Sequence, residues 1–210
     1  LRTPLTSIIG SSASYIENHT ELSSEEKLEL ITTINEDSNW LLNMVENLLS
    51  VTRLHSDGHK VTKEQEIVEE VVSEAIDRLE KRLPDASILV SAPDEMLMIP
   101  MDPLLIEQVL INLLENAVVH SESARPVELV ITDDGPTVTF HVIDHGKGIQ
   151  ESALPDIFSS QYKGSLTSDT KRGMGIGLSI CRTIIQAHDG TITARNHEDG
   201  AEFAFSLPAS

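Results

Sequence analysis

The sequence predicts an α+β protein, in which an N-terminal helical hairpin precedes a sandwich of helices on one face of a mixed sheet. Residues 1–56 carry apolar side chains three and four positions apart, which is typical of helices. Ser56-Asp57-Gly58 interrupts this pattern. Beyond it, helical and strand-like segments follow one another without strict βαβ alternation, which favours an α+β arrangement. We therefore expect a hairpin over 1–57 and a second domain over 58–210.

Two narrow apolar stripes define the hairpin. They comprise Leu5, Ile8, Ser12 and Tyr15 in the first helix, and Leu28, Ile31, Asn35, Ser38, Leu42, Val45 and Leu49 in the second. Asn18-His19-Thr20 marks the break between them, and Ser23 or Ser24 is a suitable cap because two glutamates follow. Two hairpins that join their stripes form a four-helix bundle, so the pattern predicts a homodimer. Docking of the stripes on the second domain is the alternative.

The second domain mixes helices with short strands. We expect helices over 67–83 and 102–119, and a third that follows a glycine-rich stretch and ends near His188. The expected strands are 88–90, 96–99, 127–132, 137–143, 191–194 and 203–207. Asp102-Pro103 is typical of a helix start, Gly135-Pro136 of a turn and Gly190 of a helix stop.

Composition excludes several classes of function. The chain has 210 residues and a formal net charge of −19, so its surface repels phosphate backbones and argues against a nucleic-acid partner. The single cysteine, Cys181, excludes an internal disulfide and a cysteine-rich zinc site. No apolar run reaches the ~20 residues of a membrane-spanning helix, and Leu1 lies within a helical pattern. We expect a cytoplasmic part of a larger protein that other segments anchor in the membrane.

Two short motifs offer polar groups for a ligand. Asn112 and Asn116 lie four positions apart and share one helix face, from which amide oxygens can ligate a hard cation; the alternative is that they cap loops. Asp144 precedes two glycines, Gly146 and Gly148, which let backbone approach a flat ligand. The carboxylate can accept a hydrogen bond from an exocyclic amine such as that of adenine. An ordinary turn is the alternative.

Two further motifs follow. Gly173-Met-Gly175-Ile-Gly177-Leu178 leads into a helix, whose N–H groups favour phosphate, although the pattern is neither a Walker A loop nor convincingly a Rossmann loop. The preceding segment, 159–172, predicts a mobile lid with cations such as Lys163 and Arg172, or else a solvated loop. Residues 200–208 alternate with period two and predict a strand.

In this order and spacing, the four motifs resemble the N, G1, G2 and terminal glycine-strand boxes of bacterial sensor histidine kinases. Ile157-Phe158 resembles their F box, and Leu1-Arg-Thr-Pro-Leu5 resembles the end of their H box. Residues 44–54 and 108–117 are similar to KdpD-type potassium sensor kinases. The resemblance implies a Bergerat-type ATP-binding domain that transfers the γ-phosphoryl of Mg-ATP to a histidine. A response regulator aspartate would receive it next, in potassium or osmotic signalling.

The resemblance also implies residue roles. Asn116 would hold Mg²⁺ with support from Asn112, and Asp144 would bind the adenine amine. The base pocket would comprise Gly146, Gly148 and Ile149, and the phosphate contacts would comprise Gly173, Gly175, Gly177 and Leu178. Lys163 and Arg172 would supply positive charge to the reaction. Thr3 would orient water when the kinase acts as a phosphatase of its partner.

Three features depart from the family pattern. The phosphate-accepting histidine would precede Leu1, and His19, His55 and His120 do not lie in that motif and are not credible replacements for it. Val119 stands where lysine is usual, and Gln161 stands where an aromatic residue is usual. These departures motivate an alternative, a non-enzymatic dimerisation and interaction module with a degenerate nucleotide site. An ATPase of the gyrase or Hsp90 type is disfavoured, because those proteins carry glutamate at the position of Asn112.

Overall fold

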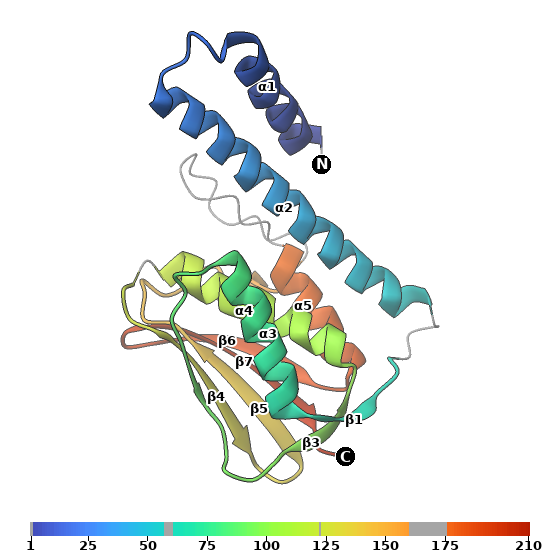
Figure 1. The fold of residues 1–210 in the computed structure, drawn as a ribbon. Coiled ribbons are helices and arrows are strands. Elements are labelled where there is room, and N and C mark those ends of the chain that lie inside the picture. Colours follow the sequence, from blue (N-terminus) through green and yellow to red (C-terminus); the bar gives the residue numbers. More distant parts are fainter. Residues whose placement is uncertain (1, 57–60, 122, 160–175) are drawn as a thin grey trace. The chain divides into compact units, whose positions relative to one another are not determined.

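The computed structural model describes residues 2–56, 61–121, 123–159 and 176–210. The chain divides into two compact units, Leu1–Leu49 and Ser50–Ser210 (Figure 1). The first is helical, and the second combines helices with sheets. Of the helices in the described ranges, none has both the length and the hydropathy that a bilayer crossing requires.

Two helices form the N-terminal part. α1 spans Arg2–Asn18, and α2 spans Ser24–Ser56 and runs back in the opposite direction (Figure 1). A capping box begins α2: the N–H of Glu26 donates to Oγ of Ser23 at 3.2 Å, and the N–H of Ser23 donates to Oε2 of Glu26 at 2.8 Å. Of the two serines that the sequence offered as caps, Ser23 is therefore the cap, and Ser24 is the first residue of α2. The reciprocal bonds satisfy two N–H groups that the first turn would otherwise leave exposed.

The second unit contains seven strands and three α-helices among its described residues. The strands are β1 (Glu64–Ile67), β2 (Ile88–Ser91), β3 (Met98–Met101), β4 (Val127–Asp133), β5 (Thr137–Ile143), β6 (Thr191–His197) and β7 (Gly200–Pro208). The helices are α3 (Val68–Arg82), α4 (Pro103–Ser121) and α5 (Ile176–Ala187), with a short 3₁₀ turn at Leu154–Asp156. Each expected strand and helix of this unit is present, with ends that differ by a few residues.

The principal sheet has five strands in the order β2-β4-β5-β7-β6. β2 pairs with β4 in parallel, and the other pairs are antiparallel, so the sheet is mixed. Helices α3, α4 and α5 lie on one of its faces (Figure 1). This arrangement confirms the predicted sandwich, and it places the end of β5 next to the start of β7, where the candidate site begins.

Apolar residues between the sheet and the helices form the core. Phe140 of β5 and Phe205 of β7 stack with ring centroids 4.5 Å apart, and both are fully buried. Leu110, Leu113 and Leu114 of α4 are completely buried on the helical side. α4 is apolar around most of its circumference, which is typical of a helix enclosed on several sides. It therefore forms a rigid support for its few polar side chains.

Two local features differ from the expectation. β1 pairs with β3 in a separate two-stranded sheet, and the sequence did not predict this strand. Its residues Glu64-Gln65-Glu66 are all polar, so they lack the alternation with apolar residues that indicates a strand. After α5, the left-handed residue is Asp189 (φ 61°) and not Gly190. Gly190 is required for another reason, since a Cβ at this position would collide with the carbonyl oxygen of Ser206 in β7.

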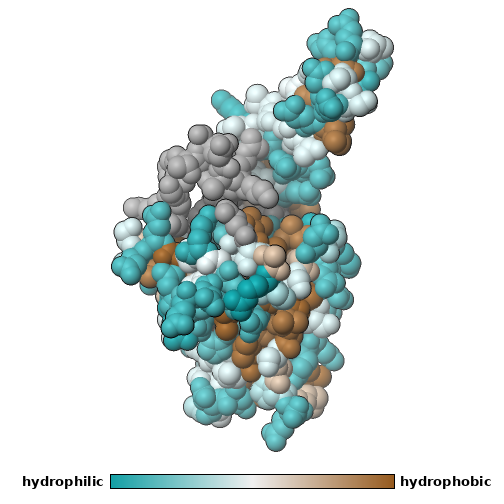
Figure 2. Space-filling view, turned by 90° about the vertical axis from the view of Figure 1, so that its left-hand side faces the viewer, coloured by the Kyte–Doolittle hydropathy of each residue, from teal (hydrophilic) through white to brown (hydrophobic). Residues whose placement is uncertain are grey.

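Hydrophilic residues cover most of the molecular face shown in Figure 2, and hydrophobic residues are exposed among them.

Within the described strands, β2 pairs with β4 alone and is thus an edge strand. Its Leu89 and Val90 are exposed. The opposite edge strand, β6, carries mainly polar side chains, which protect it from pairing with other chains.

Candidate nucleotide site

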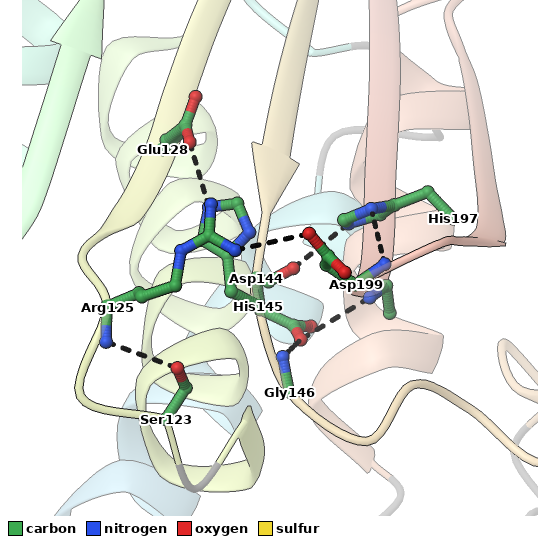
Figure 3. Close-up of polar contacts among 9 residues, drawn as sticks. Ser123, Arg125, Glu128, Asp144, His145, Gly146, His197 and Asp199 are labelled. Atoms are coloured by element: carbon green, nitrogen blue, oxygen red, sulfur yellow. Dashed lines mark hydrogen bonds and ion pairs between the residues drawn. The ribbon is translucent and has the colours of Figure 1, made fainter.

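Asp144 follows β5 directly, and its carboxylate is held by backbone groups on two sides. Oδ1 accepts hydrogen bonds from the N–H of Gly146 at 2.9 Å and from the N–H of Ala201 in β7 at 3.3 Å (Figure 3). The residue is only 6% exposed. Among the described residues, none donates to the second oxygen, Oδ2, and this oxygen is not sealed from solvent. The carboxylate is therefore fixed in orientation and keeps one acceptor for a ligand.

Glycines around Asp144 allow backbone segments to meet. A Cβ on Gly146 would collide with the backbone of Ser121 at the end of α4, and a Cβ on Gly200 would collide with the carbonyl group of Asp144. Gly148 adopts φ +70°, a conformation that side chains disfavour. The loop from Asp144 to Ile149 is thus enclosed between α4 and the start of β7.

The two asparagines of α4 lie one helical turn apart and are both partly buried. Gln108 donates to Oδ1 of Asn112 at 3.2 Å. A Cβ added to Gly177 would lie 3.7 Å from the carboxamide carbon of Asn112. The Asn112 side chain therefore meets the first turn of α5. For Asn116, no side-chain hydrogen bond to another described residue is found. Its amide oxygen thus remains available for a cation or for water.

The structure describes only part of the glycine-rich motif and of the predicted lid. Gly177 and Leu178 lie in the first turn of α5, where backbone N–H groups are unpaired within a helix. Lys163, Arg172, Gly173 and Gly175, and also Gln161, lie outside the described residues. Ile157 is buried, and Phe158 packs edge-on against Phe203 with ring centroids 6.2 Å apart. The F-box pair therefore anchors the chain just before residue 160.

Thr3, the remaining predicted site residue, lies exposed in the first turn of α1. It belongs to the first compact unit, whereas the nucleotide candidates belong to the second. Val119, which replaces the usual lysine, is partly buried on α4. Its side chain contributes no charge to the site.

The hairpin between β6 and β7 contributes residues that the sequence motifs did not indicate. His197 donates from Nε2 to the carbonyl oxygen of Asp144 at 3.0 Å, and its Nδ1 accepts from the N–H of Asp199 at 3.4 Å (Figure 3). Asn196 forms two hydrogen bonds of 2.7 Å with the backbone of Ile149. The sequence predicts strands over 191–194 and 203–207 but no contact of this hairpin with a loop, because nothing in the pattern shows which loop the strand ends touch.

Polar contacts surround the hairpin and the first loop residue. Arg125 contacts the carboxylate of Asp199 at 3.3 Å, and His145 lies 2.8 Å from Glu128 (Figure 3). The imidazole rings of His145 and His197 meet edge to face, with centroids 6.0 Å apart. The Asp144 backbone is consequently held from both sides of the sheet end, and its side chain needs little reorganisation to accept a ligand.

Comparison with known proteins matches both parts of the chain. The model of the family described as "Histidine kinase-, DNA gyrase B-, and HSP90-like ATPase" matches residues 101–210. The chain belongs to this family. A second family model, the His Kinase A (phospho-acceptor) domain, matches residues 1–57. This ATPase-family chain thus has a phospho-acceptor segment before its ATPase segment, which agrees with the predicted histidine kinase core.

Curated relatives of this ATPase-family member include sensor kinases. The chain is 43% identical to the sensor protein KdpD of Clostridium acetobutylicum and 36% identical to that of Escherichia coli, in each case over 99% of this chain. It spans 23% of the length of each of these two relatives. The findings favour the kinase interpretation over the non-enzymatic interaction module.

A solved structure of histidine kinase ThkA in complex with the response regulator protein TrrA resembles the whole chain. The TM-score is 0.72 at 25% sequence identity, and the match covers 100% of this chain and 58% of that one. The catalytic domain of ThkA alone matches 71% of this chain with a TM-score of 0.63. The likeness to ThkA therefore extends over both units described above.

Proposed function

We propose that the chain is the core of a two-component sensor histidine kinase, which binds Mg-ATP and passes the γ-phosphoryl group to a histidine and then to a response regulator aspartate. The observation that carries this proposal is the Asp144 carboxylate. One oxygen is occupied by two backbone N–H groups, and the other is available beside the loop from Asp144 to Ile149, here called the glycine loop. Such an acceptor suits the exocyclic amine of adenine, because it is oriented before the base arrives.

The remaining nucleotide contacts follow the chain from the base to the phosphates. Gly146, Gly148 and Ile149 form the base pocket in this proposal. Gly173, Gly175, Gly177 and Leu178 offer backbone N–H groups to the phosphates, since they lead into the N-terminus of α5. Lys163 and Arg172 supply the positive charge that a chain of net charge −19 otherwise lacks near a triphosphate.

Asn116 is the proposed Mg²⁺ ligand, with Asn112 one turn earlier as its support. The residues fit the ion: an amide oxygen without a described hydrogen-bond partner faces the same side of α4 as Asn112, which meets the start of α5. When bound, Mg²⁺ neutralises charge on the phosphates. Asn112 keeps its amide oriented through Gln108, at 3.2 Å.

We assign dimerisation to the hairpin of residues 1–57 and nucleotide binding to residues 58–210. Six large apolar residues of the predicted stripes are exposed in the single chain: Leu5, Leu28, Ile31, Leu42, Val45 and Leu49. A second copy that covered them would remove this apolar surface from water, which supports a homodimer. Thr3, exposed on α1, is proposed to orient water during the phosphatase reaction.

The proposed partner is the receiver domain of a response regulator, by analogy with the solved complex of ThkA and TrrA. The proposed signalling context is potassium or osmotic stress, by analogy with the two relatives named KdpD. Both analogies concern the whole protein. Phosphotransfer from the whole protein to its receiver domain, followed with γ-labelled ATP, tests them together.

Titration calorimetry with Mg-ATP tests the nucleotide site on the 210-residue chain. Asp144→Asn should weaken binding about 100-fold, because the amide oxygen must take the place of Oδ1 and its NH₂ group then faces the adenine amine. Asp134→Asn is the matched control, since Asp134 is exposed and lies in the β4–β5 turn. The absence of saturable heat in the parent chain, or equal affinity of parent and Asp144→Asn, contradicts the proposed site.

A further inference from the structure

The side chain of Asn196 holds one residue of the glycine loop by both of its backbone groups. Oδ1 of Asn196 accepts from the N–H of Ile149 at 2.7 Å, and Nδ2 donates to the carbonyl oxygen of Ile149 at 2.7 Å. The residues are 47 positions apart in the sequence. Asn196 is in β6, one position before its end, and Ile149 follows Gly148 in the loop after β5.

The paired bonds imitate strand pairing. A carboxamide has the donor and acceptor of a peptide group, and two residues that exchange both hydrogen bonds form the closely spaced pair of an antiparallel ladder. The Asn196 side chain therefore extends the hydrogen bonding of β6 into a loop that has no strand of its own. A side chain that ends in a single hydroxyl or methyl group could not replace the carboxamide, because it cannot bond to the N–H and the carbonyl oxygen of Ile149 at once.

Gly148 and Asn196 depend on each other. Gly148 has φ +70°, and a Cβ built on it would lie 2.9 Å from Oδ1 of Asn196, closer than side-chain carbons approach. Gly148 adopts this conformation, which residues with a side chain rarely adopt, directly before the residue that Asn196 binds. The second glycine of the motif is thus needed for the contact with Asn196, as well as for the approach of a ligand.

The neighbouring residue holds the other end of the same loop. His197 donates to the carbonyl oxygen of Asp144, while the N–H of Ala201 donates to Oδ1 of Asp144 (Figure 3). The β6–β7 hairpin consequently contacts both the first and the last residue of the loop. Asn196 itself is exposed and adds nothing to the core, so the effect of its two bonds is concentrated on the loop.

We propose that Asn196 is a positioning residue for adenine binding: its carboxamide fixes Ile149, and with it the loop that carries Asp144, in the conformation that accepts the base. This inference rests on the nucleotide function proposed above. Both hydrogen bonds are exposed, so in this proposal they close the loop against an open form in which water replaces them. Adenine binds the closed form, so a residue that stabilises the closed form raises the apparent affinity without touching the ligand.

The first test compares Asn196→Ala with Thr193→Ala. Thr193 is also exposed on β6, but it lies on the opposite face of the strand and serves as the matched control. Losing two net hydrogen bonds should weaken binding of Mg-ATP by about 10-fold in the Asn196→Ala chain, and of ADP by the same factor, because the loop acts on the base. The Ile149 amide should also exchange its hydrogen faster in the absence of nucleotide.

The second test uses Asn196→Asp and pH. At about pH 7.5 the introduced carboxylate is ionised, retains the acceptor and faces the carbonyl oxygen of Ile149 with negative charge, so nucleotide affinity should fall at least as far as in Asn196→Ala. At about pH 5 a protonated fraction regains a donor, and the affinity relative to the parent at the same pH should rise. A purely structural deficit has no reason to recover in this way.

The outcomes separate the two proposals. A parent chain that binds no nucleotide removes the basis of both. A parent chain that binds Mg-ATP, together with an Asn196→Ala chain of equal affinity, overturns the role of Asn196 alone. The same conclusion follows if ATP and ADP lose different factors, or if the deficit of Asn196→Asp does not change with pH.

Discussion

His188 joins two helices through one buried imidazole, whose Nε2 accepts the backbone N–H of Asp102 at 3.0 Å. Its Nδ1 donates to the carbonyl oxygen of Ile184 in α5 at 2.8 Å. Asp102 caps α4, because its Oδ1 accepts from the N–H of Leu105 at 3.2 Å. The end of α5 is therefore tied to the start of α4. One nitrogen donates and the other accepts, so the ring is needed in its neutral form.

Replacing His188 should change how stability depends on pH. Burial lowers the pKa of His188, and the nearby charge of Lys63 acts in the same direction. The unfolded chain binds a proton near pH ~6.5, whereas the folded chain resists it, so this residue destabilises the fold as pH falls below ~6.5. In His188→Gln this contribution disappears. Urea unfolding at pH values between about 7.5 and 5.5 measures it as a shallower loss of unfolding free energy.

His19→Gln provides the control for this measurement. His19 is exposed in the turn between α1 and α2, so this variant removes a histidine without changing the contact between α5 and α4. A His188→Gln profile that parallels the parent would show that the ring is protonated in the folded chain without cost. The hydrogen-bond assignment to Asp102 would then be incorrect.

Gly200→Ala should remove nucleotide binding and destabilise the second unit. A Cβ at this position meets the carbonyl group of Asp144, so the start of β7 must move away from the residue that it supports. The expected cost is about 2–4 kcal/mol of unfolding free energy. Gly10→Ala is the contrasting variant, because its Cβ meets nothing within 4 Å and it should stabilise α1 by about 0.5–1 kcal/mol. Thermal melts of both variants that shift equally would contradict this difference.

Glu202 should stabilise the fold in its ionised form. Burial opposes ionisation, but hydrogen bonds from His141 and Arg195, at 2.8 and 2.7 Å, outweigh it and lower the pKa of Glu202. Stability from this group is therefore present above the unfolded pKa of about 4.3 and is lost as pH falls through the folded value. Glu202→Gln should cost about 1–3 kcal/mol at neutral pH, with less difference from the parent in acid.

Chemical denaturation at neutral and acidic pH measures this difference for Glu202. Glu198→Gln is the matched control, since Glu198 is exposed in the turn between β6 and β7. The control should leave the unfolding free energy within about 0.5 kcal/mol of the parent. A Glu202→Gln chain that is as stable as the control at neutral pH would show that the network with His141 and Arg195 contributes nothing.

Cys181 should be inert to thiol reagents in the folded chain. Burial raises the pKa of its thiol to about 12, despite an opposing hydrogen bond from Asn112. The thiolate is the reacting species, and at pH 8 only a fraction on the order of 10⁻⁴ is ionised. Labelling with a coloured disulfide reagent should therefore follow unfolding and reach completion in denaturant. Rapid labelling of the native chain would mean that α5 opens without global unfolding.

The elements of the sheet unit were predictable because their signals are local. The Asp102-Pro103 start of α4 rests on a cap within three residues, and the β4–β5 turn rests on Gly135, which has φ +86°. Alternation with period two correctly predicts the strand over residues 200–208, which is β7. The order of the motifs also indicates the nucleotide site, since each motif brings its own glycine or polar group.

Contacts across the sequence were not predictable in the same way. Asn196 and Ile149 meet only because β6 and β7 close beside β5, and a strand pattern does not contain this register. Gly190 has the same origin, since a distant carbonyl group and not helix termination demands glycine there. β1 was not predicted because its own residues carry no strand pattern. Among the described strands it pairs with β3, and this pairing cannot be read from its sequence.

The dependence of Asp144 on β7 has a consequence for synthesis of the protein. One of the two N–H groups that hold its carboxylate belongs to Ala201, 57 positions later, and the strand that carries Ala201 lies inside the sheet, between β5 and β6. A ribosome-bound chain that has already exposed the loop from Asp144 to Ile149 therefore still lacks part of the proposed nucleotide pocket. We expect nucleotide bound at this proposed site to stabilise the chain only after β7 has emerged.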